Sequence, residues 1–562
     1  MTTTQINGGE AVYRVLRDQG VKTVFGLLGG SMLELYDALY THAGIAYVGA
    51  RDERAAGHMA DAYARMTGGP GIVLGAQAGP GVANLVTAVA EAHLAYSPVV
   101  VIAGAISRRD LGKDTFQEID QVALFAPISK GSILVTKAER LADMLRDAIR
   151  LAMSGRRGPV VLHVPRDLFA APVSPPAKGP VSIARLGPAA PADIAAIAEL
   201  LAKASRPVIF AGGGFKWSDG REALTALAGA LEIPIVASTG HADVMPHGHR
   251  WFAGQAGPRG NHVASRLTKE ADVMVVLGAR LGFNSTFHSH DYVGADTRIA
   301  HVDIEGSAAG RYFPAEIAAQ GDARLTAEAL RQIAVRPDCD EWRECFLRDM
   351  EGLRAERAGE AHLSTLPMHP RRALAEIRAE LPPDAIVTLD TGNTCLQAAD
   401  RLAHYAPKSL ITPLDFGLVG FGLAAAIGAK AASPKRPVVA IMGDGAAGYT
   451  MIEIQTAVSH KLPIVIIILD NEAWGAEKAY QQEFFGGRLL GAEIASPRFD
   501  LFAQNCGGKG IWVDGPGGMG PALAEALASG ETTVIQSKID PGALMTLRKD
   551  LFKQTDEQPD RT

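Results

Sequence analysis

The feature that most constrains this chain is a pair of apolar runs that each end in polar residues. Residues 437–442 are apolar and lead into Gly443-Asp444-Gly445, and residues 462–469 are apolar and lead into Asp470-Asn471. The two polar tips lie 27 positions apart (471 − 444), with a helix-like stretch between them. Continuous apolar runs of this length are typical of parallel strands buried on both faces. The spacing therefore predicts a strand–helix–strand unit of an α/β fold.

The same two tips form a candidate metal site. The carboxyl ends of parallel strands are where open α/β sheets bind ligands. A carboxylate from Asp444 and an amide oxygen from Asn471 suit Mg²⁺, which takes few protein oxygens and shares those of substrate phosphates. The glycines beside Asp444 let backbone N–H groups at a helix start approach a diphosphate. A lone Gly-Asp-Gly is usually a turn, but this strand context favours a metal–diphosphate site.

A second segment near the N-terminus has a related pattern. Glu53 lies where an apolar strand gives way to an Ala-rich helix over residues 55–65. Gly79-Pro80-Gly81 follows the next apolar strand, and Asn84 comes shortly after it. An acid in the first turn of a helix is favoured by the helix dipole, which is the ordinary explanation of Glu53. A catalytic role is the alternative.

Together these segments resemble the motifs of thiamine diphosphate (ThDP) enzymes, and the resemblance covers nearly the whole chain. It implies that Asp444, Asn471 and the carbonyl of Ala473 hold the metal, with Asp470 where a second asparagine is usual. It also implies that Glu53 hydrogen-bonds the pyrimidine ring of ThDP and shares the proton that promotes ylid formation. The cofactor then carries the hard chemistry while the protein controls placement and protons.

The resemblance implies further cofactor contacts. Val419, 25 residues before Asp444, stands where an apolar side chain supports the bent conformation of ThDP, although a core valine would look the same. Residues 390–394 follow another strand end, either as a plain helix N-cap or as a diphosphate contact. The expected cofactor-binding residues are Gly79, Asn84, Asn393, Thr394, Val419, Gly443, Gly445 and Ala446.

Length and two composition breaks predict several domains. A chain of 562 residues exceeds one hydrophobic core, and breaks fall at the Pro-rich residues 171–180 and near residues 366–370. Each third alternates apolar strands with amphipathic helices, which predicts an α/β protein with three doubly wound parallel-sheet domains. We expect a pyrimidine-binding domain (1–180), a central nucleotide-fold domain (181–360), a diphosphate-binding domain (361–541) and a tail that is a candidate lid (542–562).

Composition narrows the partners and the compartment. Hydrophobic residues make up 47% and charged residues 21%, and the net charge of −6 gives no basic field for nucleic acid. The apolar runs are far too short to span a membrane, and residues 1–5 lack a secretory pattern. Four scattered cysteines indicate reduced thiols. We therefore expect a cytoplasmic protein without nucleic-acid or membrane partners. In the family the first domain of one subunit faces the third of another, which implies a homodimer or homotetramer.

The central third has a glycine-rich turn after an apolar strand, at residues 212–214. In relatives this domain binds FAD, ADP or nothing. The residues after Arg280 look closer to the branch that carries ADP, which implies that Arg280 stacks on adenine and Asp303 contacts the ribose. A vacant nucleotide fold is the alternative.

The reaction is indicated mainly by residues 471–494. Residues 26–32 and 108–121 contain no histidine, although other ThDP enzymes place catalytic histidines in these loops. Residues 474–494 resemble actinobacterial 2-hydroxyacyl-CoA lyases, of the type that splits 2-hydroxyisobutyryl-CoA into acetone and formyl-CoA, and sulfoacetaldehyde acetyltransferase. A lyase needs a base for the 2-hydroxyl, and a carboxylate in a closed, poorly hydrated pocket can serve.

The candidate bases are Glu493, which we prefer, and Glu477, with an exposed loop acid and an exposed helix acid as the alternatives. Gln117 is a candidate hydrogen-bond donor to the substrate carbonyl, or a loop-packing residue. The phosphates of an acyl-CoA substrate need cations, which Arg548 and Lys549 could supply unless the tail is a solvated helix.

We therefore expect a ThDP- and Mg²⁺-dependent carbon–carbon lyase. It would cleave the C1–C2 bond of a 2-hydroxyacyl-CoA to a ketone or aldehyde plus formyl-CoA, reversibly as an acyloin condensation. A transferase resembling sulfoacetaldehyde acetyltransferase or acetolactate synthase is the alternative. A silent regulatory subunit is disfavoured because Glu53, Asp444 and Asn471 are intact. The sequence leaves the acyl chain and the physiological direction open.

Overall fold

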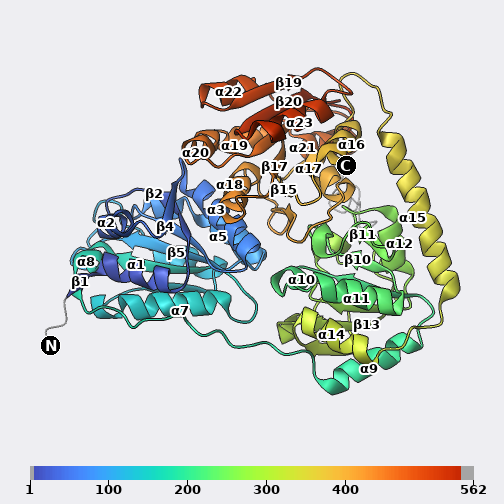
Figure 1. Ribbon diagram of the computed structural model, residues 1–562, viewed down its shortest axis with the longest axis horizontal. Helices are drawn as coiled ribbons and strands as arrows, with labels where there is room; N and C mark the ends of the chain where they lie inside the picture. Colours follow the sequence, from blue (N-terminus) through green and yellow to red (C-terminus); the bar gives the residue numbers. More distant parts are fainter. Residues whose placement is uncertain (1–4, 546–562) are drawn as a thin grey trace, which may run out of the picture.

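The computed structural model describes residues 5–545, which contain three six-stranded sheets of parallel strands. Figure 1 shows the first domain on the left, the central domain at the lower right and the third domain at the top. A two-residue antiparallel pair, β1 (Ile6–Asn7) with β8 (Pro172–Val173), closes the first domain. The predicted fold class of three parallel-sheet α/β domains is confirmed. Among the helices of residues 5–545, none has the length and apolar character needed to cross a bilayer.

The first sheet is covered on both faces, and its strands are mostly apolar. Ile72 and Leu74 pack on one side, in the core formed with α1 (Gly8–Asp18), α2 (Leu33–His42) and α7 (Leu141–Met153). Val73 packs on the other side, against α3 (Glu53–Thr67) and α5 (Val86–Leu94). The strands in spatial order are β3 (Ala46–Gly49), β2 (Thr23–Leu27), β4 (Gly71–Gly75), β5 (Val99–Ala105), β7 (Val160–Pro165) and β6 (Gly131–Leu134).

The third sheet repeats this order of succession, whereas the central sheet has a different one. The central sheet runs β11 (Phe252–Gln255), β10 (Ile235–Ala237), β9 (Pro207–Ala211), β12 (Val273–Leu277), β13 (Arg298–Asp303) and β14 (Ile317–Gln320). The third runs β16 (Leu410–Ile411), β15 (Ile386–Leu389), β17 (Val438–Gly443), β18 (Val465–Asp470), β20 (Thr533–Lys538) and β19 (Lys509–Val513). The strand that comes first in the chain is β2, β9 or β15 in the three sheets, and it is never an edge strand. Later strands lie on both sides of it, which creates a topological switch point.

The first and third domains share one hydrophobic core. Helix α3 packs against α18 (Gly422–Ala432), and buried residues of both domains form a single cluster. The contact is close: a side-chain carbon on Gly428 would lie 2.0 Å from the carbonyl oxygen of Met59, so only glycine fits. Backbone groups also cross the boundary, since the N–H of Arg51 donates to Glu453 Oε1 (2.9 Å). The first and third domains of one chain are therefore held in a fixed relation.

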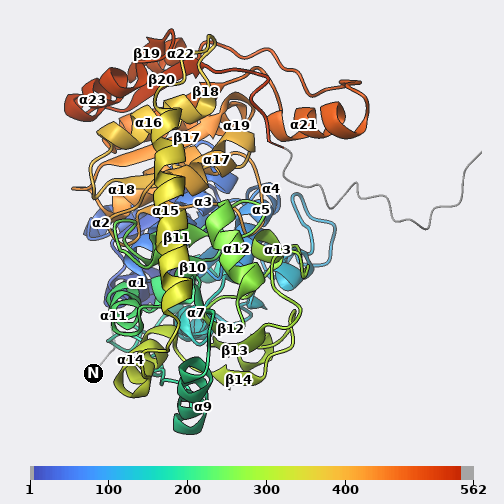
Figure 2. The ribbon, with the colours of Figure 1, turned by 90° about the vertical axis from the view of Figure 1, so that its right-hand side faces the viewer.

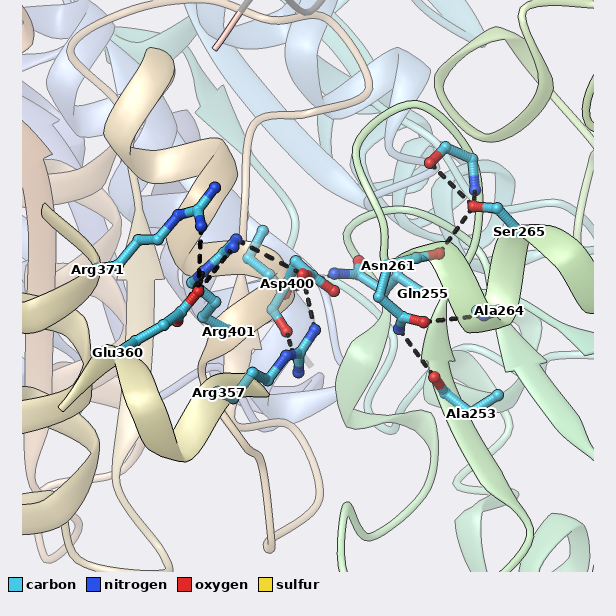
Figure 3. A network of polar contacts seen from close by, with 12 residues as sticks. Ala253, Gln255, Asn261, Ala264, Ser265, Arg357, Glu360, Arg371, Asp400 and Arg401 are labelled. Atoms are coloured by element: carbon cyan, nitrogen blue, oxygen red, sulfur yellow. Dashed lines mark hydrogen bonds and ion pairs between the residues drawn. The ribbon is translucent and has the colours of Figure 1, made fainter. Parts of the chain in front are cut away.

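A long helix, α15 (Asp340–Glu360), runs beside the central and third domains (Figure 2). Near its C-terminal end, Arg357 pairs with Asp400 (2.8 Å) and Glu360 pairs with Arg401 (3.1 Å), as Figure 3 shows. Asp400 and Arg401 end helix α17 (Asn393–Arg401). This network fixes the C-terminal end of α17, whose first residues lie at the switch point of the third sheet.

Candidate cofactor and active site

The three predicted metal ligands lie together at the carboxyl ends of the neighbouring strands β17 and β18. Asp444 begins α19 (Asp444–Thr450) and is 2% exposed. One end of the Asn471 amide lies 3.1 Å from Asp444 Oδ1 and 3.1 Å from the carbonyl oxygen of Ala473. With the amide oxygen at this end, three oxygens converge, and a cation among them removes their mutual repulsion. The donor set therefore fits the few-oxygen coordination that Mg²⁺ takes when phosphates supply further ligands.

Two neighbours of this cluster have clear structural roles. Ser496 Oγ donates to Asp444 Oδ2 (2.5 Å), a contact that no sequence pattern indicated because it joins residues 52 positions apart. Burial raises the pKa of Asp444. Asp470 is fully buried and accepts from Gln536 (2.8 Å) and pairs with Lys538 (3.0 Å). Asp470 thus has its own partners, which agrees with the ligand position falling on Asn471.

The strand ends on either side of the third switch point supply the expected diphosphate contacts. Asn393 and Thr394 begin α17 after β15, and Gly443, Gly445 and Ala446 surround Asp444 at the start of α19. Asn393 is buried and hydrogen-bonds the backbone of Met545 through both side-chain atoms (2.6 and 3.1 Å). The hydroxyl of Thr391 is buried and has no partner within residues 5–545. An orphaned hydroxyl at this place fits a bound acceptor such as a phosphate oxygen.

The segment that carries Val419 is held by a buried carboxylate. Asp390 follows β15 and accepts N–H bonds from Thr391 (2.8 Å), Gly420 (2.9 Å) and Gly422 (2.6 Å). Burial raises the pKa of Asp390 to about 6. Val419 is half-buried and packs on the core shared by the first and third domains. Its remaining surface is available to an apolar part of a cofactor.

Glu53 lies at the carboxyl edge of the first sheet, after the edge strand β3, with two of its predicted neighbours. It is half-buried and begins α3 after the N-cap Asp52. Asn84 Nδ2 donates to Glu53 Oε2 (2.9 Å). A side-chain carbon on Gly81 would lie 2.9 Å from Glu53 Oε1, so the glycine leaves room for this carboxylate. The structure therefore brings Glu53, Gly81 and Asn84 together.

Gln117 lies in the loop after β5, against the Gly79 turn. Its carbonyl oxygen would lie 2.2 Å from a side-chain carbon on Gly79. Its side-chain oxygen accepts from Gln77 Nε2 (2.5 Å), and Gln77 Oε1 accepts the N–H of Gly30 (3.0 Å). Gln77 and Gln121, which binds Gly79, were not among the predicted site residues. Gln77 closely follows the apolar strand β4, and this place at the carboxyl edge of the sheet is the signal that could have identified it. Gln121 begins a short helix 16 residues after β5 (121 − 105) and carries no such signal.

The predicted acid–base residues lie in the segment after the metal ligands. Glu493 forms an antiparallel bridge with Ala473, and the N–H of Trp474 donates to the carbonyl of Ala492 (2.8 Å). Its carboxylate is 64% exposed and pairs with the mostly buried Lys478 at 2.9 Å. Glu477 is exposed in the first turn of α21 (Gly475–Phe484), which projects from the third domain (Figure 2). In the described part of a single chain, Glu493 therefore lies outside the closed pocket that we expected, because its loop lies at the surface.

A cavity of about 280 Å³ lies at the switch point of the central sheet and is lined by Arg280 and Asp303. Arg280 pairs with Asp415, and its guanidinium carbon lies 4.7 Å from the ring centroid of Tyr96. Asp303 is buried, which raises its pKa, and accepts the N–H of Glu305 (2.9 Å). The two predicted nucleotide-binding residues thus share one cavity. Arg548 and Lys549, the candidate CoA contacts, lie outside the described residues.

Comparisons with known proteins place this site in a family. Three models match: thiamine pyrophosphate enzyme, N-terminal TPP binding domain (residues 6–124), the central domain (194–330) and the C-terminal TPP binding domain (390–537). The sulfoacetaldehyde acetyltransferase of Alcaligenes xylosoxydans xylosoxydans is 33% identical, over 94% of this chain and 92% of that protein. The acetolactate synthase isozyme 3 large subunit of Escherichia coli (strain K12) is 34% identical, over 93% and 92%. A probable acetolactate synthase large subunit of Methanocaldococcus jannaschii is 31% identical, over 96% and 93%. The chain belongs to the thiamine diphosphate (thiamine pyrophosphate) enzyme family.

Proposed function

We propose that this enzyme is a Mg²⁺-dependent lyase that cleaves the C1–C2 bond of a 2-hydroxyacyl-CoA. The products would be a ketone or aldehyde and formyl-CoA. When bound, ThDP would supply a nucleophilic, carbanionic carbon that adds to the carbonyl carbon of the thioester. Asp444, Asn471 and Ala473 would hold the metal, and Glu53 would hold the proton on the aminopyrimidine ring.

The chain's own acid–base step is assigned to Glu493. Its carboxylate takes the proton of the 2-hydroxyl as the C1–C2 bond breaks, which releases the ketone or aldehyde. The same group then returns that proton to the former C1, giving the hydrogen of formyl-CoA. Atoms balance without an external reductant or oxidant. Gln117 would donate a hydrogen bond to the substrate carbonyl.

The observation that carries this proposal is the backbone pairing of Glu493 with Ala473. This pairing holds a carboxylate beside the metal-ligand segment, and Lys478 limits the directions in which that carboxylate points. The loops at residues 26–32 and 108–121 offer no histidine for proton transfer. A partner subunit that covers the exposed loop would provide the dry surroundings in which a carboxylate acts as base.

The rival is an acetyl transferase or a carboligase, as the names of the relatives suggest. A sulfonate or phosphate acceptor needs cations close to the cofactor. Within residues 471–494 the cations are Lys478, which is paired with Glu493, and the exposed Arg488. The loop therefore has one cation to offer an anionic acceptor, which favours the lyase.

We also infer that the enzyme is a homodimer or homotetramer. Phe116 is 83% exposed and Leu490 is 88% exposed, and both lie in the loops that carry candidate site residues. Large apolar side chains in such a position are typical of a surface that a second subunit covers. Light scattering after size-exclusion chromatography measures the mass, and a monomer at micromolar concentration would contradict this inference.

For the central cavity we propose an adenine nucleotide such as ADP. Its volume is near the lower end of the range for small-molecule sites, roughly 300–1,000 Å³. Arg280 would stack on adenine and Asp303 would contact the ribose. Arg156 and Arg157, which also line the cavity, would neutralise a diphosphate. Calorimetric titration with ADP tests this, and unchanged affinity in Arg280→Ala would remove Arg280 from the site.

Product analysis tests the main proposal. The ThDP- and Mg²⁺-loaded enzyme is incubated with 2-hydroxyisobutyryl-CoA and, separately, with sulfoacetaldehyde plus phosphate. Acetone and formyl-CoA from the first mixture are the expected products. Acetyl phosphate from the second mixture, with no acetone from the first, would establish the transferase instead.

A further inference from the structure

A buried glutamine connects the Gly79 turn to a buried histidine. Gln121 begins α6 (Gln121–Phe125) and is 6% exposed. Its Oε1 accepts the N–H of Gly79 (2.8 Å), and its Nε2 donates to the carbonyl of Gly104 (3.0 Å) and to His163 Nδ1 (3.2 Å). These bonds use the amide oxygen and both amide hydrogens. Every polar atom of this side chain therefore has a partner, as a buried amide requires.

The histidine fixes which end of the amide faces Gly79. His163 lies on β7, is fully buried, and its Nε2 lies 2.9 Å from Ser132 Oγ. The Ser132 hydroxyl donates to the carbonyl of Val122 (2.8 Å), so its oxygen accepts from His163 Nε2–H. This leaves His163 Nδ1 as an acceptor, which only the NH₂ end of Gln121 can serve. Burial lowers the pKa of His163 to about 4, so the neutral ring that this pattern needs persists at neutral pH.

The Gly79 turn in turn orients the groups that touch Glu53. Gly79 has φ +71°, a conformation that favours glycine, and its carbonyl accepts the N–H of Ala83 (2.8 Å) to start α4 (Pro80–Ala83). Gly81 lies on this helix and leaves room for Glu53 Oε1, and Asn84 lies just after it and donates to Glu53 Oε2. A shift of Gly79 would therefore move the neighbours of both Glu53 carboxylate oxygens together.

We propose that Gln121 is a positioning residue for Glu53, which it holds through the Gly79 turn in an orientation set by His163. The proposal rests on the proposed role of Glu53 toward the aminopyrimidine ring of ThDP. Diphosphate and metal are held by the third domain, so loss of the Gln121 amide should slow the step that depends on Glu53 and leave ThDP bound. A displacement of about 1 Å at a reacting centre costs roughly 10²-fold in rate.

The test compares Gln121→Met with a matched control, Gln255→Met. Methionine keeps the length of the side chain and removes its hydrogen bonds. Gln255 is 1% exposed, accepts the N–H of Gly240 (φ +83°) and donates to the carbonyl of Ala399, so it makes the same kinds of bonds at another junction. The first readout is amide hydrogen exchange of the apo protein by mass spectrometry. Exchange in residues 79–83 should rise about 10-fold in Gln121→Met and stay unchanged in Gln255→Met.

The second readout is exchange of the C2 proton of bound ThDP. We expect Gln121→Met to slow it about 10–100-fold, with ThDP affinity within about 3-fold of wild type, and Gln255→Met to leave it unchanged. Gln121→Glu keeps an acceptor for Gly79, and its other oxygen, protonated at this buried position, donates to His163 Nδ1, so C2 exchange should stay within about 5-fold of wild type. This variant decides the matter if Gln121→Met does not fold.

Two results would overturn the proposal. One is wild-type C2 exchange in Gln121→Met, and the other is C2 exchange in Gln121→Glu as slow as in Glu53→Gln. Equal C2 exchange in wild type and Glu53→Gln would instead refute the role proposed for Glu53. In that case the amide hydrogen exchange still tests the role of Gln121. Unchanged protection of residues 79–83 in Gln121→Met would show that the Gln121 side chain does not hold the Gly79 turn.

Discussion

Replacing Ser496 with alanine should weaken Mg²⁺ binding by about 10–100-fold, or roughly 1.4–2.8 kcal/mol. Ser496 Oγ donates to Asp444 Oδ2 at 2.5 Å, and Asp444 is 2% exposed. The N–H of Asn471 reaches the other oxygen, Oδ1, at 3.4 Å. Without the serine hydroxyl, Oδ2 loses its short side-chain hydrogen bond and the carboxylate can rotate away from the metal position. Groups that orient metal ligands contribute in this range.

The measurement is calorimetric titration of Mg²⁺ at saturating ThDP. Ser537→Ala is the matched control, since Ser537 is fully buried on β20 of the same domain and donates to the carbonyl of Val513 (3.1 Å). We expect this control to keep wild-type Mg²⁺ affinity. Mg²⁺ affinity of Ser496→Ala within about 3-fold of wild type would refute the idea that the serine orients the ligand.

Three further predictions concern buried or half-buried carboxyl groups. Glu53→Gln should bind ThDP but lose exchange of the ThDP C2 proton. A wild-type exchange rate in this variant, measured by quenched-flow NMR, would refute the role assigned to Glu53. Asp444→Ala should lower Mg²⁺ and ThDP affinity together, because one metal links the protein to the diphosphate; unchanged cofactor binding by calorimetry would remove Asp444 from the metal site. Burial raises the pKa of Asp390 from 3.8 to about 6. Between these pH values the folded state binds a proton that the unfolded state does not. The free energy of unfolding therefore rises as the pH falls from 7 toward 4, by at most about 3 kcal/mol. Asp390→Asn should remove this component, and an identical change of Tm between pH 7 and pH 5 in both proteins would contradict it.

The strands around the metal site could be predicted from sequence because parallel strands buried on both faces are apolar at every position. The apolar run at residues 462–469 correctly predicted a strand here. The strand, β18, begins only at Val465, because Pro463 has no N–H to donate to the sheet. The helix-like stretch over residues 447–460 is two short helices, α19 and α20 (Glu453–Ser459). Gly445 and Gly448 weaken a continuous helix there.

The rest of the site depends on contacts that no local pattern encodes. Ser496 reaches Asp444 across 52 residues of chain, and Gln121 reaches His163 across 42. Ser496 lies in a loop and Gln121 is the first residue of a five-residue helix, and in neither place does a period of 2 or of 3.6 mark the inward face. The surroundings of Glu493 were expected to be closed, yet the loop is open in a single chain. Burial that depends on a second subunit cannot be read from the pattern of one sequence.

The role of Glu493 in C1–C2 cleavage is the central claim, and ketone release from 2-hydroxyisobutyryl-CoA tests it most directly. Wild type, Glu493→Gln and Glu477→Gln are compared at equal ThDP and Mg²⁺ content. We expect turnover to fall about 10²–10⁴-fold in Glu493→Gln, the usual contribution of a placed acid or base, and to fall less in Glu477→Gln. Near-wild-type turnover of Glu493→Gln would show that another group deprotonates the hydroxyl.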